Sequence, residues 1–338
     1  MKVGILTFHD AHNYGAVLQA YALKKYIKNL GYDAKVINYH HYTIPDGYPR
    51  EANIERWEKF NPFIQELIDY DENVYTSEED LEKLDIDYWI CGSDQIWNTE
   101  ITCGFNKGFF LDFKSNGKKI SYAVSMGISE LPKEQEAKFK ESLNKIDCIS
   151  VREETLKRYA EKFTNKKITQ TLDPTFLLDP KDYMDLTGEN KYGKYILIYS
   201  LVEDKRLAQV AQKIAKEKNL KIIELNDKIK SNYFCDQISC ASPEEFLTLI
   251  KNAEVIVSNS LHGTIFSIIF EKDFYTITRL QDRNARIGSI LNIVEMKDRL
   301  IGNIEEMNNV RGQDYEKAYK KLEIEKEKSK EFLKEALS

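Results

Sequence analysis

Short apolar runs alternate with amphipathic stretches along this chain, and this alternation constrains the fold more than any other feature. Val3–Phe8 is an apolar run that ends at a polar loop, as expected for a buried strand. In Gly15–Leu30 the apolar residues recur on one stripe of a helix, which Gly31 ends. Ala34–Tyr39 supplies the next strand. A strand, a helix and a strand in succession predict a βαβ unit with a parallel sheet.

The second half of the chain repeats this layout. Tyr195–Leu201 is a predicted strand, Leu207–Lys218 a helix and Lys221–Leu225 a strand. Pro180, Gly188 and Gly193 interrupt a polar stretch between the halves and predict a boundary there. We therefore expect an α/β fold of two Rossmann-like domains whose parallel sheets face a cleft. The expected parts are a domain over 1–185 with an insertion at about 40–85, a domain over 190–312, and a helix over 313–338.

Bulk properties exclude several classes of protein. The chain has 338 residues, 42% of them hydrophobic, and a formal net charge of −6. An acidic chain lacks the basic surface that a nucleic-acid binder needs. No apolar run approaches the roughly 20 residues of a membrane span, and the first residues lack the features of a signal peptide, so we expect a cytoplasmic protein. The five cysteines form no CxxC pair, and we predict no metal site and no cofactor.

Candidate site residues follow predicted strands, because ligands of open α/β sheets bind outside the carboxyl ends of the strands. Asn13 and Tyr14 precede the first helix and could contact an acceptor, although Asn13 could simply cap that helix. Asp94, Gln95 and Trp97 follow the strand Tyr88–Cys91. Asp94 and Gln95 could bond sugar hydroxyls, Asp94 could also take a proton, and Trp97 could stack on a sugar. The alternative is a turn anchored by a buried tryptophan.

Further along the chain, Arg152 ends a predicted strand and could hold a carboxylate or phosphate. Its alternative is an ion pair with Glu153 or another neighbour. His262 lies after the apolar run Val255–Val257, in a turn before a predicted helix. Its ordinary pKa of about 6.5 suits proton transfer near neutrality. The helix start beside it would hold an anion; the flanking residues there are Ser260, Gly263 and Thr264.

A cluster of arginines follows the last predicted strand. Arg279, Arg283 and Arg286 lie within eight residues of an otherwise acidic chain. They indicate a local anion site, with a solvated loop as the alternative.

Several phrases of this sequence resemble the polysaccharide pyruvyl transferases. They are NYGAVLQAYAL (13–23), GSDQIWN (92–98), SVRE (150–153), LDPTFLL (172–178), SNSLHGTIFS (258–267) and DRNARI (282–287). The resemblance implies a GT-B-like fold and transfer of a pyruvyl group from phosphoenolpyruvate to a saccharide of a cell-surface polysaccharide. The implied product is a pyruvate ketal, with phosphate released, as in the synthesis of exopolysaccharide or capsule.

The resemblance also implies roles for single residues. His262 matches the catalytic histidine of the family, and Arg152 matches an arginine that binds the donor. Some members carry an arginine two residues before that histidine, where this chain has Ser260. Arg283 or Arg286 could supply the missing charge. The expected partners are phosphoenolpyruvate and a saccharide acceptor, free or lipid-linked.

Two other functions remain open at this point. A GT-B-like glycosyltransferase would use a nucleotide sugar with the same architecture. A non-catalytic carbohydrate-binding member of the family would keep the fold without turnover, and Ser260 is the feature that favours it.

Overall fold

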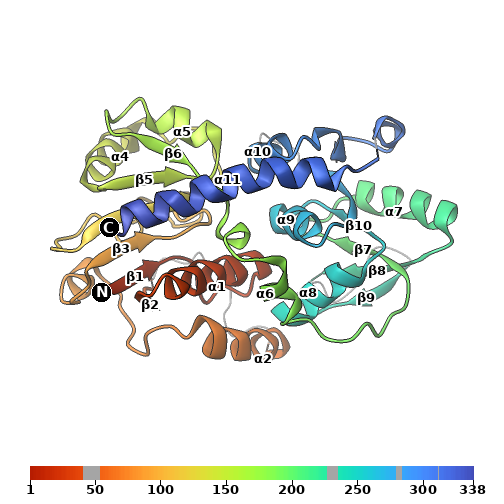
Figure 1. Cartoon of the computed structure of the whole chain (residues 1–338), viewed down its shortest axis with the longest axis horizontal. Coiled ribbons are helices and arrows are strands. Elements are labelled where there is room, and N and C mark those ends of the chain that lie inside the picture. Colours follow the sequence, from red (N-terminus) through yellow and green to blue (C-terminus); the bar gives the residue numbers. More distant parts are fainter. Residues whose placement is uncertain (41–53, 227–234, 279–283, 311) are drawn as a thin grey trace. The chain divides into compact units, whose positions relative to one another are not determined.

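The computed structural model describes residues 1–40, 54–226, 235–278, 284–310 and 312–338 (Figure 1). The chain forms two compact units. Unit 1 comprises Met1–Asn53, Asn61–Leu178 and Ile324–Ser338, and unit 2 comprises Ile54–Phe60 and Asp179–Glu323. The division thus falls between Leu178 and Asp179, whereas the sequence placed the end of the first domain at residue 185.

Unit 1 is built on six parallel strands in the order β2-β1-β3-β4-β5-β6. The strands are β1 (Lys2–Leu6), β2 (Asp33–Val36), β3 (Tyr88–Cys91), β4 (Lys118–Val124), β5 (Cys148–Val151) and β6 (Ile168–Gln170). The helical segments are α1 (Tyr14–Asn29), the π-helix η1 (Ile64–Ile68), α3 (Glu78–Leu81), α4 (Lys133–Lys145), α5 (Glu154–Ala160) and the 3-10 turn η2 (Pro174–Phe176), while α2 (Ile54–Phe63) crosses the division. The chain winds outward from β1 in both directions, so the topological switch point lies between the carboxyl ends of β1 and β3.

Unit 2 is built on a second sheet of six parallel strands, in the order β12-β11-β10-β7-β8-β9. The strands are β7 (Tyr195–Tyr199), β8 (Lys221–Leu225), β9 (Asp236–Ile238), β10 (Val255–Ser258), β11 (Asp273–Ile277) and β12 (Leu300–Ile301). The helical segments are α6 (Pro180–Met184), α7 (Lys205–Lys218), α8 (Pro243–Asn252), α9 (Leu261–Ile269), α10 (Ala285–Ile293), η3 (Lys297–Arg299) and η4 (Glu305–Asn309), while α11 (Tyr315–Ala336) crosses the division. The winding direction reverses between β7 and β10, which places the switch point at their carboxyl ends. The predicted α/β class with two parallel sheets is confirmed.

The central strands of both sheets are buried on both faces. Every residue of Tyr88–Cys91 and of Val255–Ser258 is buried, as the crossover helices of a parallel sheet require. The edge strands β9 and β12 were not predicted, because two or three residues carry no readable periodicity. His262 was predicted to lie in a turn before the helix. Helix α9 begins at Leu261, however, so His262 lies in its first turn.

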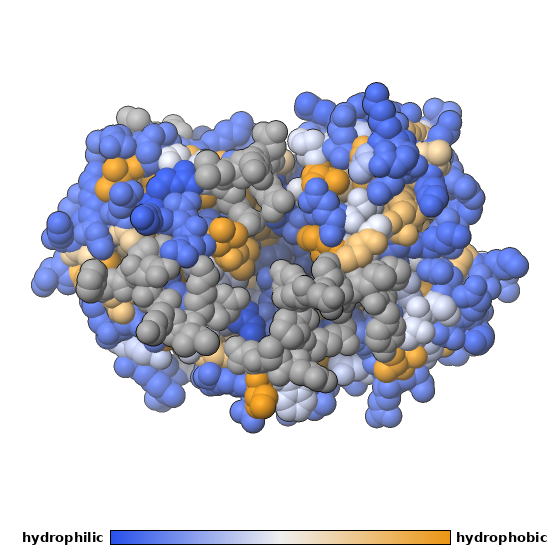
Figure 2. All heavy atoms as spheres, turned by 180° about the vertical axis from the view of Figure 1, so that it is seen from behind, coloured by the Kyte–Doolittle hydropathy of each residue, from blue (hydrophilic) through white to orange (hydrophobic). Residues whose placement is uncertain are grey.

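Helix α11 belongs to both units, since the division falls between Glu323 and Ile324. Its last turns pack on unit 1, where Leu333 is fully buried and the Ser329 hydroxyl accepts from the Leu172 amide at 2.9 Å. The face shown in Figure 2 is mainly hydrophilic, with hydrophobic residues in small groups. Among the described residues, no helix combines the length and apolar character needed to cross a membrane.

Candidate active site

His262 lies at the switch point of unit 2, beyond the carboxyl end of β10. Strand β10 ends at Ser258, and Ser260 then caps α9 by accepting a hydrogen bond from the Gly263 amide at 3.3 Å. His262 is 7% exposed, in the first turn of this helix. The amino end of a helix carries partial positive charge, so the histidine stands beside a place that favours an anion.

Gly263 is required by the tight contact between this turn and the sheet. A Cβ atom at this position would lie 2.4 Å from the Ser258 hydroxyl and 3.0 Å from the Tyr199 ring. Ser258 in turn donates to the Tyr199 carbonyl at 2.7 Å and accepts from the Ser260 amide at 3.0 Å. The absence of a side chain therefore seats the start of α9 directly on β7 and β10.

The hydroxyls of Ser260 and Thr264 hold the start of α9. The Thr264 hydroxyl donates to the Ser260 carbonyl at 3.0 Å and lies 2.9 Å from the Thr276 hydroxyl on β11. Both residues are buried, at 2% and 1% exposure. They were predicted to bind the donor. The Thr264 hydroxyl already donates its hydrogen to the Ser260 carbonyl, whereas the Ser260 hydroxyl only accepts in its bond from the Gly263 amide. In this structure they position the turn that carries His262.

Of the predicted arginine cluster, the structure describes Arg286 alone. It lies in the first turn of α10, which packs against α9, and is partly buried. Arg279 and Arg283 lie outside the described residues.

The carboxyl edge of unit 1 carries a buried ionic network centred on Arg152. Its guanidinium binds Glu153 at 2.9 Å and Asp173 at 2.6 Å, and Nη1 also donates to the Ser93 hydroxyl at 3.3 Å. Burial alone would lower the pKa of Arg152, but the carboxylates of Glu153, Asp173 and Asp94 raise it overall. The ion pair that the sequence offered as an alternative is thus present.

Two N–H groups of Arg152 remain for a ligand. Nη2 is buried and has no hydrogen-bond partner among the described residues. A buried donor of this kind is costly unless something satisfies it. The two carboxylates therefore orient Arg152 while its outer nitrogen stays uncommitted.

Asp94 lies at the switch point of unit 1, directly after β3. Its backbone is in the left-handed region, with φ of 73°, and its carbonyl accepts from the Ser125 amide at 2.9 Å. Its carboxylate accepts from the Gln95 amide at 2.8 Å. Asp94 and Gln95 are only partly buried, so both keep polar atoms at the sheet edge, where they were predicted to meet an acceptor.

The other three predicted acceptor residues have structural positions. Trp97 is fully buried, stacks on Phe110 and donates its ring N–H to the Phe109 carbonyl at 2.9 Å. The predicted stacking of Trp97 on a sugar is therefore wrong, because neither face of the ring is accessible. Tyr14 is 3% exposed, which likewise removes it from direct contact. Asn13 caps α1 by accepting from two amides of its first turn.

Comparison with known proteins settles the family. The family model for polysaccharide pyruvyl transferase matches residues 13–280. This range includes Asp94, Arg152 and His262, whereas Arg286 lies outside it. The chain belongs to the polysaccharide pyruvyl transferase family.

Solved structures share the fold of this pyruvyl transferase family member at low sequence identity. UDP-GlcNAc 2-epimerase from Neisseria meningitidis matches with a TM-score of 0.57 at 12% identity, covering 98% of this chain and 94% of that one. The epimerase from Methanocaldococcus jannaschii gives 0.55 at 15%, covering 93% and 94%. A glycosyltransferase from Rickettsia africae gives 0.52 at 12%, covering 100% and 98%. A search among curated proteins gave no match. These likenesses show a GT-B-like fold.

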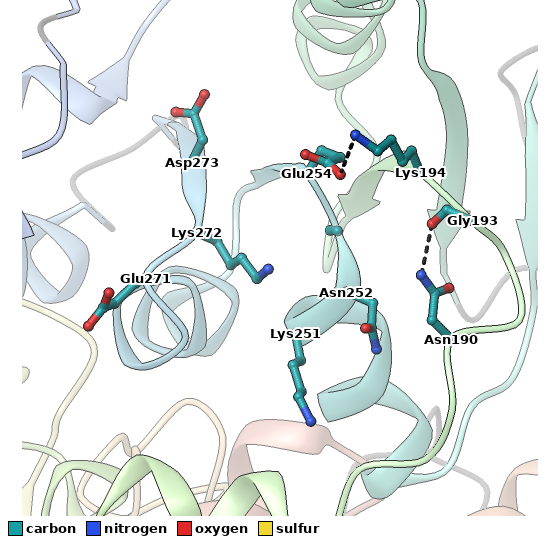
Figure 3. A pocket seen from close by; sticks show the side chains of 10 residues that line it. Asn190, Gly193, Lys194, Lys251, Asn252, Glu254, Glu271, Lys272 and Asp273 are labelled. Atoms are coloured by element: carbon teal, nitrogen blue, oxygen red, sulfur yellow. Dashed lines mark hydrogen bonds and ion pairs between the residues drawn. The ribbon is translucent and has the colours of Figure 1, made fainter.

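A polar hollow of about 610 Å³ in unit 2 does not coincide with the candidate site of this transferase (Figure 3). Its lining comes from residues just before β7, β10 and β11, among them Lys194, Glu254 and Lys272. These are the amino ends of the strands, and His262 lies beyond the carboxyl end of β10.

Two partners of Arg152, namely Asp173 and Ser93, were not predicted as site residues, and neither was Ser125, whose amide binds the Asp94 carbonyl. The Ser125 hydroxyl is also buried without a partner among the described residues. Asp173 is the second residue of the phrase LDPTFLL, which the sequence analysis did identify. The ion pair of Asp173 with Arg152 could not be predicted, because it depends on β5 and β6 being neighbours.

Proposed function

We propose that this transferase moves the pyruvyl group of phosphoenolpyruvate onto a saccharide and releases phosphate. The observation that carries the proposal is His262, a proton-transfer group in the first turn of α9 at the switch point of unit 2. The matched family name supports transfer to a polysaccharide. The donor, the ketal product and the role of each residue are our inference.

The chemistry assigned to His262 is protonation of the donor. As an imidazolium it gives a proton to the methylene carbon of phosphoenolpyruvate, and the adjacent carbon becomes an oxocarbenium-like centre. One acceptor hydroxyl attacks that carbon, phosphate leaves, and a second hydroxyl closes the ketal. Of the two hydroxyl protons released, one restores His262 and the other leaves with phosphate. No step changes the oxidation state of a co-reactant.

The donor has a carboxylate and a phosphate, and two features of this chain suit such groups. The start of α9 offers partial positive charge beside His262. Nη2 of Arg152 offers two N–H groups in a fixed orientation, since Glu153 and Asp173 hold the rest of the guanidinium. Ser260 stands where some members carry an arginine, so we assign the remaining positive charge to Arg286, with Arg283 as the other candidate.

Asp94 is our candidate for orienting or deprotonating the acceptor hydroxyl, with Gln95 as a second contact. Both are partly exposed after β3. The acceptor is then a saccharide that presents two hydroxyls at a spacing which a single carbon can bridge. We expect an exopolysaccharide or capsule unit, free or lipid-linked, and a cytoplasmic reaction.

The test measures phosphate release from phosphoenolpyruvate in the presence of a panel of hexosides. His262→Gln should bind the donor as the parent does but lose about 10²–10⁴-fold in turnover, the contribution of a general acid. Arg152→Lys, which keeps the charge but replaces the three-nitrogen guanidinium by a single ammonium, should weaken donor binding. Arg158→Lys is its matched control, since Arg158 is exposed on α5. Full turnover in His262→Gln would exclude the mechanism.

A further inference from the structure

Two polar groups at the carboxyl edge of unit 1 are buried without a partner. They are the hydroxyl of Ser125, which directly follows β4, and Nη2 of Arg152, which directly follows β5. Neither atom makes a hydrogen bond within the described part of the chain. Ser125 is 0% exposed and Arg152 is 7% exposed. Since the large majority of buried polar side-chain atoms have a partner, two exceptions on neighbouring strands indicate a ligand that supplies the missing acceptor.

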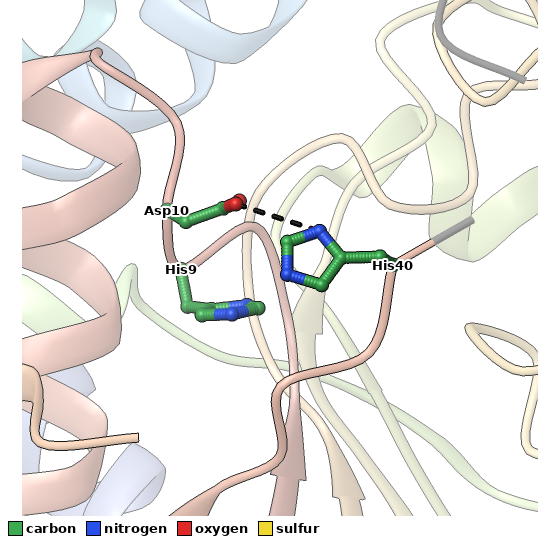
Figure 4. A group of neighbouring side chains, drawn as sticks. All are labelled: His9, Asp10 and His40. Carbon is green, nitrogen blue, oxygen red and sulfur yellow. Dashed lines mark ion pairs between the residues drawn. The ribbon is translucent and has the colours of Figure 1, made fainter. Parts of the chain in front are cut away.

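A second polar cluster at the same edge does have its partners. His9 and Asp10 follow β1, and His40 follows β2 (Figure 4). His9 Nε2 lies 3.0 Å from Asn38 Oδ1, and the ring of His40 lies 3.5 Å from the Asp10 carboxylate. These contacts account for the burial of His9 without a ligand, which distinguishes this cluster from Ser125 and Arg152.

Strand β4 contains a bulge just before its carboxyl end. Ser121 pairs with Ile149 of β5, and Val124 pairs with Val151, so β4 has one residue more than β5 over this stretch. The backbone of Ala123 is left-handed there, with φ of 46°. This conformation is costly for a residue with a side chain, and bulges that redirect a side chain are common beside active sites.

The bulge decides the direction of the Ser125 side chain. Val124 and Val151 pair in register, and both belong to the hydrophobic cluster on one face of the sheet. Because side chains alternate along a strand, Ser125 and Arg152 both project to the opposite face. Without the extra residue, Ser125 would project into the hydrophobic cluster, since a shift of one residue exchanges the two faces.

Arg152 also reaches across the end of β4. Its side chain starts from β5, and its Nη1 donates at 3.3 Å to the hydroxyl of Ser93, which follows β3. Strand β4 lies between β3 and β5, so the guanidinium passes the strand end that carries Ser125. Neighbouring strands are about 4.8 Å apart, so one small group can accept hydrogen bonds from both side chains.

We propose that the Ser125 hydroxyl and Nη2 of Arg152 together bind the carboxylate of the donor, which makes Ser125 a further donor-binding residue. The inference rests on the proposed function and assigns one of the two anionic groups of phosphoenolpyruvate. One carboxylate oxygen accepts from Arg152 and the other from Ser125. The phosphate is less suited, because Glu153, Asp173 and Asp94 already place three negative charges around the guanidinium. A dianion is repelled by these charges more strongly than a monoanion.

The experiment measures the binding of phosphoenolpyruvate to the whole chain by calorimetry. Ser125→Ala should raise the Kd at least about tenfold, the effect of losing a hydrogen bond to a charged group. Ser142→Ala is the matched control, because Ser142 is equally buried in unit 1 but its hydroxyl donates to Asp112 at 2.8 Å. This control should leave the Kd unchanged.

Urea unfolding separates a binding role of Ser125 from a structural one. Ser125→Ala removes a buried hydroxyl that has no partner, so its urea midpoint should be equal to that of the parent or higher. Ser142→Ala removes a hydroxyl that is bonded, so its midpoint should fall. A lower midpoint in Ser125→Ala with an unchanged Kd would overturn the proposal, because an ordered water would then serve both groups.

Competition with pyruvate and with inorganic phosphate identifies the bound group. Pyruvate carries the carboxylate alone and should compete with phosphoenolpyruvate less well in Ser125→Ala than in the parent, whereas phosphate should compete equally in both. The reverse pattern, or pyruvate that does not compete in the parent, would overturn the carboxylate assignment. An unchanged Kd for phosphoenolpyruvate in Ser125→Ala would overturn this inference alone. If the parent binds no phosphoenolpyruvate, the proposed function fails with it.

Discussion

Removal of the Asp173 carboxylate should destabilise unit 1 strongly. The side chains of Arg152 and Asp173 are 7% and 1% exposed and meet at 2.6 Å. Removing one partner of a buried ion pair costs about 3–5 kcal/mol, because the other charge stays buried. Arg152 keeps Glu153, which favours the lower end. Asp173 Oδ1 also accepts from the Thr175 amide at 3.1 Å, and losing such a cap costs about 1 kcal/mol.

We therefore expect Asp173→Ala to lose about 3–4 kcal/mol of unfolding free energy. Asp173→Asn keeps the capping oxygen and should lose about 1 kcal/mol less. At an m-value of about 1–3 kcal/mol/M, the urea midpoint of Asp173→Ala should fall by roughly 1–4 M.

Tryptophan fluorescence can follow unit 1 alone. Trp89 and Trp97 are fully buried in that unit, and Trp57 belongs to unit 2, so Trp57→Phe removes the unwanted signal. Asp85→Ala is the matched control, because its pair with Lys2 is as short, at 2.7 Å, but exposed. If the midpoints of Asp173→Ala and Asp173→Asn matched that of Asp85→Ala, the buried network around Arg152 would not stabilise unit 1.

Two further predictions concern the packing of α9 in unit 2 and the loss of stability at low pH. Gly263→Ala should cost about 1–3 kcal/mol in denaturant unfolding followed by circular dichroism, because its Cβ meets Ser258, and an unchanged midpoint would contradict the close seating of α9. Burial raises the pKa of Asp112, but bonds from Lys145 and Ser142 lower it overall, below 3.8. Its stabilisation is thus present above pH 3.8 and is lost as the pH falls further. In Asp112→Asn the unfolding free energy should fall less steeply below pH 3.8 than in the parent. An equally steep fall in the variant would refute the contribution assigned to Asp112.

The interior strands could be predicted from the sequence, because strands buried on both faces are continuous apolar runs. Tyr88–Cys91 and Lys221–Leu225 have the predicted bounds. The edge strands β9 and β12 were beyond prediction, since a pairing of two residues such as Leu300–Ile301 depends on β11 beside it. Ser260 caps α9 in the structure, whereas His262 was predicted to lie in a turn before the helix, so the bond from the Gly263 amide to Ser260 was missed.

The candidate site could be predicted only as far as strand ends could be recognised. His262, Asp94 and Arg152 lie where their strands placed them, at the carboxyl edges. The environment of each side chain was not predictable. A tryptophan after a strand is found both in protein cores and in sugar-binding sites. Only its packing against Phe110 shows that Trp97 belongs to the core.

Partners distant in sequence were also hidden. Asp173 reaches Arg152 because β6 pairs with β5, and His40 reaches His9 because β2 pairs with β1. Neither juxtaposition has a local motif. Strand order, which the sequence does not state directly, decides both.

The measurement that tests the central claim most directly is thermal stability with phosphoenolpyruvate, beside a panel of nucleotide sugars. A ligand at 100 times its Kd should stabilise the folded chain by about 2.7 kcal/mol. We predict stabilisation by phosphoenolpyruvate and not by the nucleotide sugars, reduced in Arg152→Lys and retained in Arg158→Lys. Stabilisation by a nucleotide sugar alone would contradict the assigned donor.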